Sequence, residues 1–234
     1  MNPNPPLDPS PTPQVALREV FYGNDVFVQA RDPRQFEAYE KSQHPSVTML
    51  TCCDARLHQL VFNFDPIDRT FVVQNIGNQL QPASGSIDYG IHHLKTPLLL
   101  ILGHTRCGAI RAAMSDYRSE SWEIIRELNG LHLPLLRCEK QEDIEKAWLD
   151  AVEHNVDYQV DLAMRRYGAV VNAGKLAIVG GVYDFANLYG RGRGRIVLLN
   201  LNGVAGQEAI RAMPVWQEFD EALSDLVLHE RKSL

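Results

Sequence analysis

Two short segments of the sequence combine residue types that bind metal ions. Residues 52–56 read Cys-Cys-Asp-Ala-Arg, and residues 104–107 read His-Thr-Arg-Cys directly after a glycine. Cys52, His104 and Cys107 together offer two thiolates and an imidazole, the sulfur and nitrogen ligands that zinc takes in tetrahedral geometry. Three protein ligands leave a fourth position for water, as in catalytic sites, whereas a fourth protein ligand closes the site and makes it structural.

The first segment also holds two candidates for the fourth ligand. Cys53 points away from Cys52 if the preceding strand continues, because successive side chains alternate across a strand. Asp54 would reach the metal, but its charge would make the two-thiolate centre anionic and suppress the ionisation of a bound water. Arg56 would hold the Asp54 carboxylate away by a bidentate ion pair. The segment therefore allows an open site and a closed one, and the Asp54–Arg56 pair would select between them.

Both segments directly follow predicted strands. Short β-rich runs bounded by turn signals occur at residues 47–52, 70–74, 97–103, 175–182 and 195–201. Helical patterns occur at 84–94, 155–167 and 214–228, the second with Gly168 as its predicted end. This alternation predicts an α/β fold with a mostly parallel central sheet flanked by helices. Functional loops of such sheets gather at the carboxyl ends of the strands, so we expect residues 52 and 104 to meet.

Length and composition indicate one folded domain. The chain has 234 residues, of which 45% are hydrophobic and 22% charged, and such values allow a sizeable core. Six prolines fall within residues 1–14, and this density predicts a disordered proline-rich tail. Residues 15–234 are expected to form a single domain.

Charge and cysteine content bear on partners and location. The net charge of −6 argues against nucleic acid and anionic membranes as partners. The apolar runs are far shorter than a membrane span, and residues 1–14 lack the basic flank and apolar core of a secretory signal. Four cysteines are too few for a disulfide scaffold. We therefore expect reduced thiols and a cytoplasmic location.

The two metal-binding segments resemble the signature of the β-class carbonic anhydrases, Cys-x-Asp-x-Arg followed by Gly-His-x-x-Cys-Gly. The resemblance spans roughly residues 35–203, most of the chain. It also rests on a Gln-x-Pro element at 43–45, a phenylalanine-led strand and turn at 71–78, a Gly-Ser-x-x-Tyr helix start at 85–89 and a late Gly-x-x-Tyr-Asp strand at 179–184.

The resemblance implies a cofactor and a reaction. Cys52, His104 and Cys107 match the family's zinc ligands. Asp54 and Arg56 match its Asp–Arg pair, which orients the metal-bound hydroxide or gates the site. The implied cofactor is Zn²⁺, and the implied activity is the reversible hydration of carbon dioxide to bicarbonate by zinc-bound hydroxide.

A substrate pocket is implied in the same way. Gln43 matches the side chain whose amide hydrogen-bonds the substrate, and Phe71, Ile76 and Tyr89 match positions that line the apolar pocket. A narrow apolar pocket with one amide donor suits carbon dioxide, which has neither net charge nor dipole. The family's pockets form between protomers, so the resemblance implies a homodimer or a dimer of dimers.

Two positions depart from the family in a way that affects regulation. In some members the aspartate of the pair binds zinc when bicarbonate occupies a nearby pocket, which uses a tryptophan and an arginine. The corresponding residues here are Met49 and Gln74. Neither supplies a cation, and Met49 offers no indole donor. We therefore expect Asp54 to stay paired with Arg56.

Two alternative functions stay open at the level of sequence. One is the hydrolysis of a linear analogue of carbon dioxide, such as carbonyl sulfide or carbon disulfide, on the same scaffold. The other is a non-catalytic zinc-bearing interaction module. Gln74 and the prolines favour the module, whereas the intact ligand set and the Asp54–Arg56 pair disfavour it. The fourth cysteine, Cys138, has no histidine or cysteine near it in the sequence and is predicted to be a packing residue.

Overall fold

The computed structural model describes residues 11–138 and 141–229, and the chain divides into two units, Met1–Gln43 and His44–Leu234. The first unit contains helices α1 (Pro13–Gln29) and α2 (Pro33–Glu37). Each begins with a proline at its first turn after a capping side chain, a combination that favours helix starts. No residue of α1 is buried within the structure described.

The prediction of a proline-rich tail falls mostly outside the described residues. Its last two residues, 13–14, belong to helix α1. Proline lacks only a backbone donor that the first helical turn leaves unused, so Pro13 starts the helix instead of preventing it.

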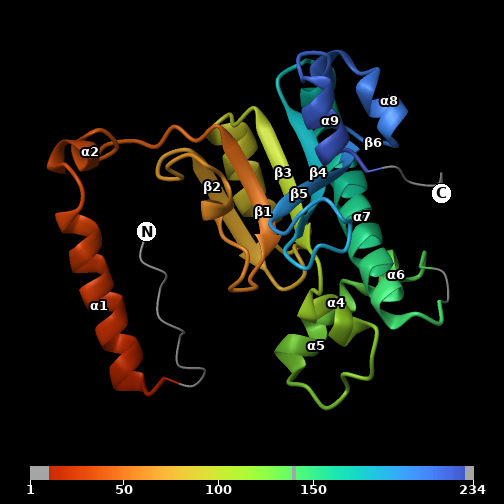
Figure 1. Ribbon diagram of the computed structural model, residues 1–234, viewed down its shortest axis with the longest axis horizontal. Helices are drawn as coiled ribbons and strands as arrows, with labels where there is room; N and C mark the ends of the chain where they lie inside the picture. The colour runs from red at the N-terminus through yellow and green to blue at the C-terminus, as the bar shows by residue number, and fades with distance from the viewer. Residues whose placement is uncertain (1–10, 139–140, 230–234) are drawn as a thin grey trace. The chain divides into compact units, whose positions relative to one another are not determined.

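The second unit is built on a six-stranded sheet in the order β2-β1-β3-β4-β5-β6 (Figure 1). The strands are β1 (Val47–Cys52), β2 (Thr70–Asn75), β3 (Leu98–His104), β4 (Ala177–Asp184), β5 (Arg195–Leu201) and β6 (Val204–Ala205). The first four strands pair in parallel, and β5 and β6 add in antiparallel orientation. The predicted α/β fold with a mostly parallel sheet is therefore confirmed, and sequence patterns missed only the two-residue β6 among these strands.

Helices and helical turns connect and cover the strands. They are η1 (Gln59–Val61), α3 (Ser84–Asp88), η2 (Tyr89–His93), α4 (Gly108–Ala113), α5 (Trp122–Asn129), α6 (His132–Leu135), α7 (Ile144–Asn172), α8 (Gln207–Arg211), η3 (Pro214–Trp216) and α9 (Glu221–Val227). The segment predicted as one helix at 84–94 starts as an α-helix in α3 and continues as the π-helical turn η2.

Two helix predictions were wrong in their extent. Helix α7 runs through Gly168, the predicted end, because a buried face that includes Tyr167 packs into the core at this point. The helix stops before Gly174, whose positive φ of 67° suits the residue that follows a helix. The predicted helix at 214–228 is two elements, because Asp220 caps a new helix, α9, after the short turn η3.

Helix α7 lies along one face of the sheet, against β3 and β4 (Figure 1). The approach requires glycine on both strands. A Cβ atom on Gly103 would lie 2.8 Å from the side chain of Val156, and one on Gly180 would lie 2.7 Å from that of Val160. This close packing fixes the end of β3, and thus His104, against α7.

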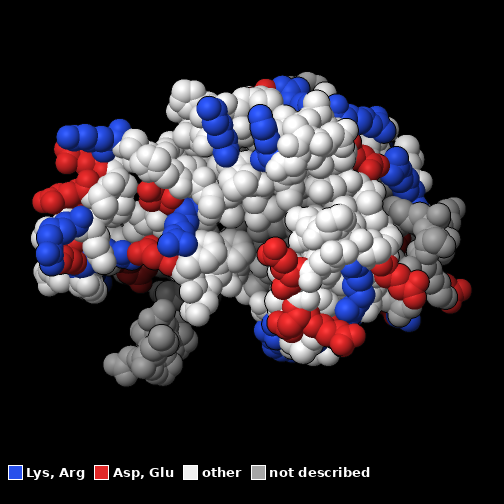
Figure 2. All heavy atoms as spheres, turned by 90° about the horizontal axis from the view of Figure 1, so that it is seen from above, with Lys and Arg blue, Asp and Glu red and all other residues white. Residues whose placement is uncertain are grey.

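Surface charge and helix composition relate to the expectation that nucleic acid and membranes are not partners. Basic and acidic side chains are mixed over the face seen in Figure 2, as the modest net charge suggests. None of the helices in the described part of the chain combines the length and the apolarity of a membrane-spanning helix.

Candidate metal centre and active site

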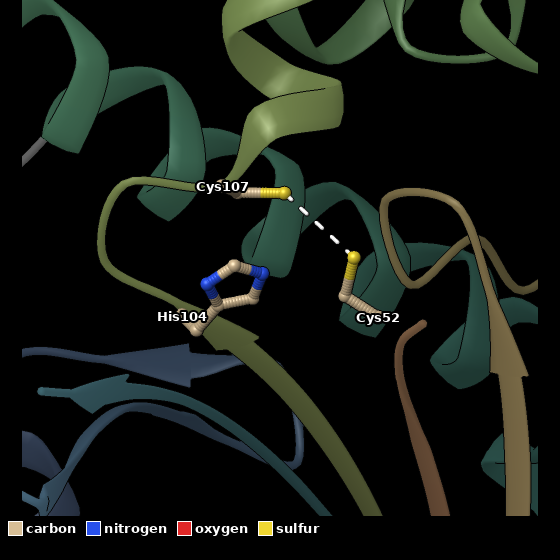
Figure 3. Close-up of side chains that lie close together, drawn as sticks. All are labelled: Cys52, His104 and Cys107. Atoms are coloured by element: carbon tan, nitrogen blue, oxygen red, sulfur yellow. Dashed lines mark hydrogen bonds between the residues drawn. The ribbon is translucent and has the colours of Figure 1, made fainter. Parts of the chain in front are cut away.

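The three expected zinc ligands come together at the carboxyl end of the sheet. Cys52 is the last residue of β1, His104 is the last residue of the neighbouring strand β3, and Cys107 caps the start of α4. One ligand atom from each lies within 4.8 Å of the others, and the two sulfur atoms are 3.9 Å apart. Figure 3 shows the sulfurs facing each other with the imidazole beside them. All three residues are buried.

The imidazole of His104 is arranged as a metal ligand. Its Nδ1 lies 3.0 Å from the carbonyl oxygen of Thr105, which fixes the proton on Nδ1 and leaves the lone pair on Nε2. Nε2 is buried and has no hydrogen-bond partner. A buried lone pair without a partner is unfavourable, and a bound cation would satisfy it. The residues present therefore fit Zn²⁺.

The two thiols also fit a divalent cation. The hydrogen bond from the Cys107 thiol lowers the pKa of Cys52, and a further bond from the backbone N–H of Gly77 acts in the same direction. The interaction with Cys52 and burial both raise the pKa of Cys107. One thiol of the pair thus ionises easily and the second does not. A cation between the sulfurs would compensate both charges.

The turn that carries Cys107 is held by the first part of α7. Arg106 adopts a positive φ of 55°, which is uncommon for a residue with a long side chain. Its guanidinium lies 3.1 Å from the carboxylate of Glu145. The indole N–H of Trp148 donates to the carbonyl of Cys107 at 2.9 Å. Sequence reasoning missed this support, because the contact joins residues that lie far apart in the sequence.

The bidentate ion pair expected between Asp54 and Arg56 is present. The two nitrogen–oxygen distances are 2.8 and 2.7 Å, and the hydrogen bond from Arg56 holds the pKa of Asp54 down at about 2. A carboxylate oxygen of Asp54 lies 3.7 Å from Nε2 of His104, so the carboxylate borders the space between the ligands. The guanidinium is fixed by the Arg106 carbonyl at 3.3 Å and by the ring of Phe185, 4.4 Å from its centroid.

Two residues close to the ligands in the fold, Cys53 and Gln74, do not belong to the ligand cluster. Cys53 is exposed and does not join the ligand cluster. Gln74, at the position of the family arginine, donates its side-chain N–H to the carbonyl of Cys52 at 3.2 Å. It therefore supports the end of β1 by a neutral hydrogen bond.

The expected substrate residues are spread over the chain. Ile76 packs against the buried cluster that contains Cys52. Phe71 and Tyr89 contact each other, with ring centroids 5.9 Å apart. Phe71, however, pairs with Thr48 near the start of β1, at the other end of that strand from the ligand. Gln43 is the last residue of the first unit and is exposed. Within the second unit, the structure thus gathers the metal ligands, whereas Phe71 lies at the other end of its strand from them.

Comparison with known proteins identifies the family. A family model described as carbonic anhydrase matches residues 47–191. Carbonic anhydrase 2 of Mycobacterium tuberculosis is 26% identical over 213 residues, which cover 86% of this chain and 99% of that protein. A carbonic anhydrase of Mycolicibacterium smegmatis is likewise 26% identical over 210 residues, covering 85% of this chain and 99% of that protein.

Solved structures agree on the fold. A tetrameric β-carbonic anhydrase from Sordaria macrospora aligns with a TM-score of 0.70 and 22% identity, over 79% of this chain and 97% of that one. A Coccomyxa β-carbonic anhydrase aligns with a TM-score of 0.67 and 23% identity, over 86% and 92% of the two chains. The chain therefore belongs to the β-carbonic anhydrase family and, with it, to the carbonate dehydratases.

Proposed function

We propose that this chain catalyses the reversible hydration of carbon dioxide to bicarbonate, with Zn²⁺ held by Cys52, His104 and Cys107. The observation that supports the metal site most directly is the convergence of three buried ligand side chains within 4.8 Å, including the unpartnered Nε2 of His104. When bound, Zn²⁺ would supply the Lewis acidity that makes a water nucleophilic near neutral pH.

The Asp54–Arg56 pair is proposed to orient the attacking water. The Asp54 carboxylate has a pKa of about 2 and is therefore ionised at neutral pH. An ionised carboxylate accepts hydrogen bonds only, so it fixes the water's proton and turns a lone pair toward the substrate. Arg56 holds the carboxylate through two hydrogen bonds, which keeps it from moving toward the metal ligands.

Substrate binding is proposed to need a second copy of the chain. Phe71 lies four positions along β2 from Asn75, the residue that pairs with Cys52, which corresponds to about 13 Å. Phe71 and Tyr89 would therefore contribute to the pocket of a partner protomer, together with Gln43, while Ile76 lines the pocket of its own chain. This arrangement predicts a homodimer or a dimer of dimers.

Helix α1 offers apolar surface for such an association. It exposes large apolar side chains at seven positions: Leu17, Val20, Phe21, Tyr22, Val26, Phe27 and Val28. A helix with so much exposed apolar surface is typical of a segment that packs against another chain. A related structure, that of the Sordaria macrospora enzyme, is described as tetrameric.

We also propose a cytoplasmic location. The four cysteines are all free in the structure, and two of them are the expected ligands. Thiolate ligands require a reducing compartment or a bound metal to stay reduced. Fractionation of cells that produce the tagged protein would test this, and recovery in an extracellular fraction would contradict it.

The experiment that tests the function is a stopped-flow assay of carbon dioxide hydration, run together with zinc analysis of the same sample. We expect about one equivalent of zinc at Cys52, His104 and Cys107 and a rate far above the buffer background. A zinc-loaded, folded protein that hydrates carbon dioxide no faster than buffer would refute the proposal. Light scattering on the same sample checks the association, and a fully active monomer would contradict the shared pocket.

A further inference from the structure

We propose that Cys138, Asp150 and His154 form a second Zn²⁺ site, separate from the one at the carboxyl end of the sheet. One ligand atom from each residue lies within 4.8 Å of the others. Cys138 follows α6, and Asp150 and His154 lie one turn apart on α7. Sulfur, nitrogen and carboxylate oxygen are all ligands that zinc accepts in tetrahedral sites.

The strongest observation concerns the imidazole of His154. Its Nδ1 lies 2.9 Å from the backbone carbonyl of Asp150 and 3.3 Å from an oxygen of the Asp150 carboxylate. Both acceptors hold the proton on Nδ1 and leave the lone pair on Nε2. Nε2 is buried without a hydrogen-bond partner, and the side chain is only 7% exposed. Among the described residues, the one other histidine with such a nitrogen is His104, the expected ligand of the first site.

The two histidines thus share one arrangement. In each, Nδ1 lies within hydrogen-bond distance of a main-chain carbonyl oxygen, at 3.0 Å for His104 and 2.9 Å for His154. In each, Nε2 is buried and unpartnered. A carbonyl that fixes Nδ1–H while Nε2 faces a cation is the usual support of a histidine ligand.

Cys138 and Asp150 supply the charge that a divalent cation needs. Burial, followed by the Asp150 carboxylate, raises the pKa of the Cys138 thiol to about 12. A cysteine thiol holds its proton at neutral pH until a metal displaces it. On binding, the sulfur–hydrogen bond breaks, the sulfur electron pair binds the ion, and the proton leaves to solvent. The resulting thiolate and the Asp150 carboxylate together neutralise Zn²⁺.

The surroundings allow an ion to enter. A pocket of about 490 Å³ lies beside Cys138 and is also lined by Ala147 and Ala151 of α7. Tetrahedral zinc with such ligands places the ligand atoms about 3.5 Å apart, so atoms that already lie within 4.8 Å of one another need to close by at most about 1.3 Å. Of the three proposed ligands, Cys138 lines this pocket, so an ion would enter from the side of Cys138.

The second site would join the segment after α6 to α7. Val152 and Val156 lie on the same helix and pack into the core cluster of the first site, so Asp150 and His154 turn to another face of α7. The same part of α7 holds the first site through the bond from Trp148 to the Cys107 carbonyl. Zinc at the second site would therefore stabilise the helix that supports the first.

Metal titration of the full chain tests the proposal. Metal-free protein is titrated with Co²⁺, whose bonds to thiolate sulfur absorb in the near ultraviolet, and zinc per chain is measured after reloading and desalting. We expect two equivalents in the unmodified protein and one each in Cys138→Ser and His154→Gln. Zinc beyond the first equivalent should raise the melting temperature of the unmodified protein but not of these variants. Cys107→Ala should keep the second equivalent, which separates this site from the first.

Two matched controls guard against loss of folding. His132→Gln replaces a histidine that lines the pocket beside Cys138 and whose Nε2 already contacts the hydroxyl of Tyr117. Cys53→Ser removes a cysteine outside both ligand clusters. Both should bind two equivalents. One equivalent in the unmodified protein, or two in a folded His154→Gln protein, would overturn the second site.

Discussion

The two histidine–cysteine clusters differ in how the chain assembles them. At the first site, the ligands stand at the ends of adjacent parallel strands and at the start of a helix, and all three are buried. At the second, two ligands are one turn apart on a long helix, and the third follows α6. A sheet edge fixes ligands through strand register, whereas the second cluster depends on the position of the segment that carries Cys138.

The two sites also differ in the number of their thiols and in the pKa values of these thiols. The first site has two buried sulfurs, and the hydrogen bond from the Cys107 thiol lowers the pKa of Cys52 in the metal-free chain. The second has a single thiol, whose pKa burial and Asp150 raise to about 12. A metal must displace a thiol proton at each site, because the pKa of Cys107 is raised as well. The first site, however, offers zinc two thiolates and the second only one. We therefore expect the first site to fill before the second.

The largest effect should follow removal of a ligand from the first site. Cys107→Ala should lose the first zinc equivalent and retain below about 1% of the hydration rate, because water then lacks its activating cation. Zinc analysis and stopped-flow kinetics measure both. Cys53→Ser is the matched cysteine control and should keep metal and rate. If Cys107→Ala kept full metal content and full activity, Cys107 would not be a zinc ligand.

The next effect should come from the ion pair beside the first site. Arg56→Ala should lower the hydration rate about 10- to 100-fold while the zinc content stays the same. The reason is that Asp54, already 3.7 Å from Nε2 of His104, would no longer be held away from the ligands. A crystal structure of the variant should show the carboxylate turned toward them.

The chain contains a matched control for this experiment. Asp116 and Arg118 form the same pair at the same spacing, with nitrogen–oxygen distances of 2.9 and 2.6 Å, on an exposed turn. Arg118→Ala should therefore leave the rate unchanged. Equal rates in Arg56→Ala and the unmodified protein would show that the first pair has no role in catalysis.

Sequence patterns identified much of the first site because its features are local. The strand at Val47–Cys52 is a β-rich, mostly buried run with a cysteine at its end, so the ligand position follows from the strand itself. The bond from Trp148 to Cys107 and the stacking of Arg56 on Phe185 could not be predicted, because they join distant segments. Cys138, predicted to be a packing residue, does pack against the core cluster of the first site, and the fold also places it beside His154, which its sequence neighbours could not show.

A smaller effect is expected at an ion pair away from both sites. Asp88 accepts hydrogen bonds from Arg166 and, at 2.7 Å, from the buried Tyr167 hydroxyl. Arg166 first, and Tyr167 to a lesser extent, hold the pKa of Asp88 down at about 2. Asp88→Asn should lower the free energy of unfolding at pH 7. Both side chains of the ion pair are about a third or more exposed, so solvent screening limits the loss to about 1 kcal/mol.

The pH dependence gives the sign of this contribution. A carboxyl group with a lowered pKa in the folded state stabilises the protein above its unfolded value, about 3.9. The contribution is lost as the pH falls from about 4 toward 2. Urea unfolding at several pH values should therefore show the unmodified protein and Asp88→Asn converging in acid. A difference that stays constant down to pH 2 would contradict the assigned pKa.

The smallest effect concerns inhibition by the product. Met49 is fully buried in an apolar cluster with Leu57, Leu100 and Leu102, and the amide of Gln74 is already bonded to the carbonyl of Cys52. A bicarbonate ion between these positions would be buried without a cation, which is unfavourable. We therefore expect bicarbonate to inhibit hydration with a simple hyperbolic dependence, and Gln74→Ala to leave the shape of that curve unchanged. Steep, cooperative inhibition of the unmodified protein, or Asp54 turned away from Arg56 in a bicarbonate-soaked crystal, would show that a second anion site exists here after all.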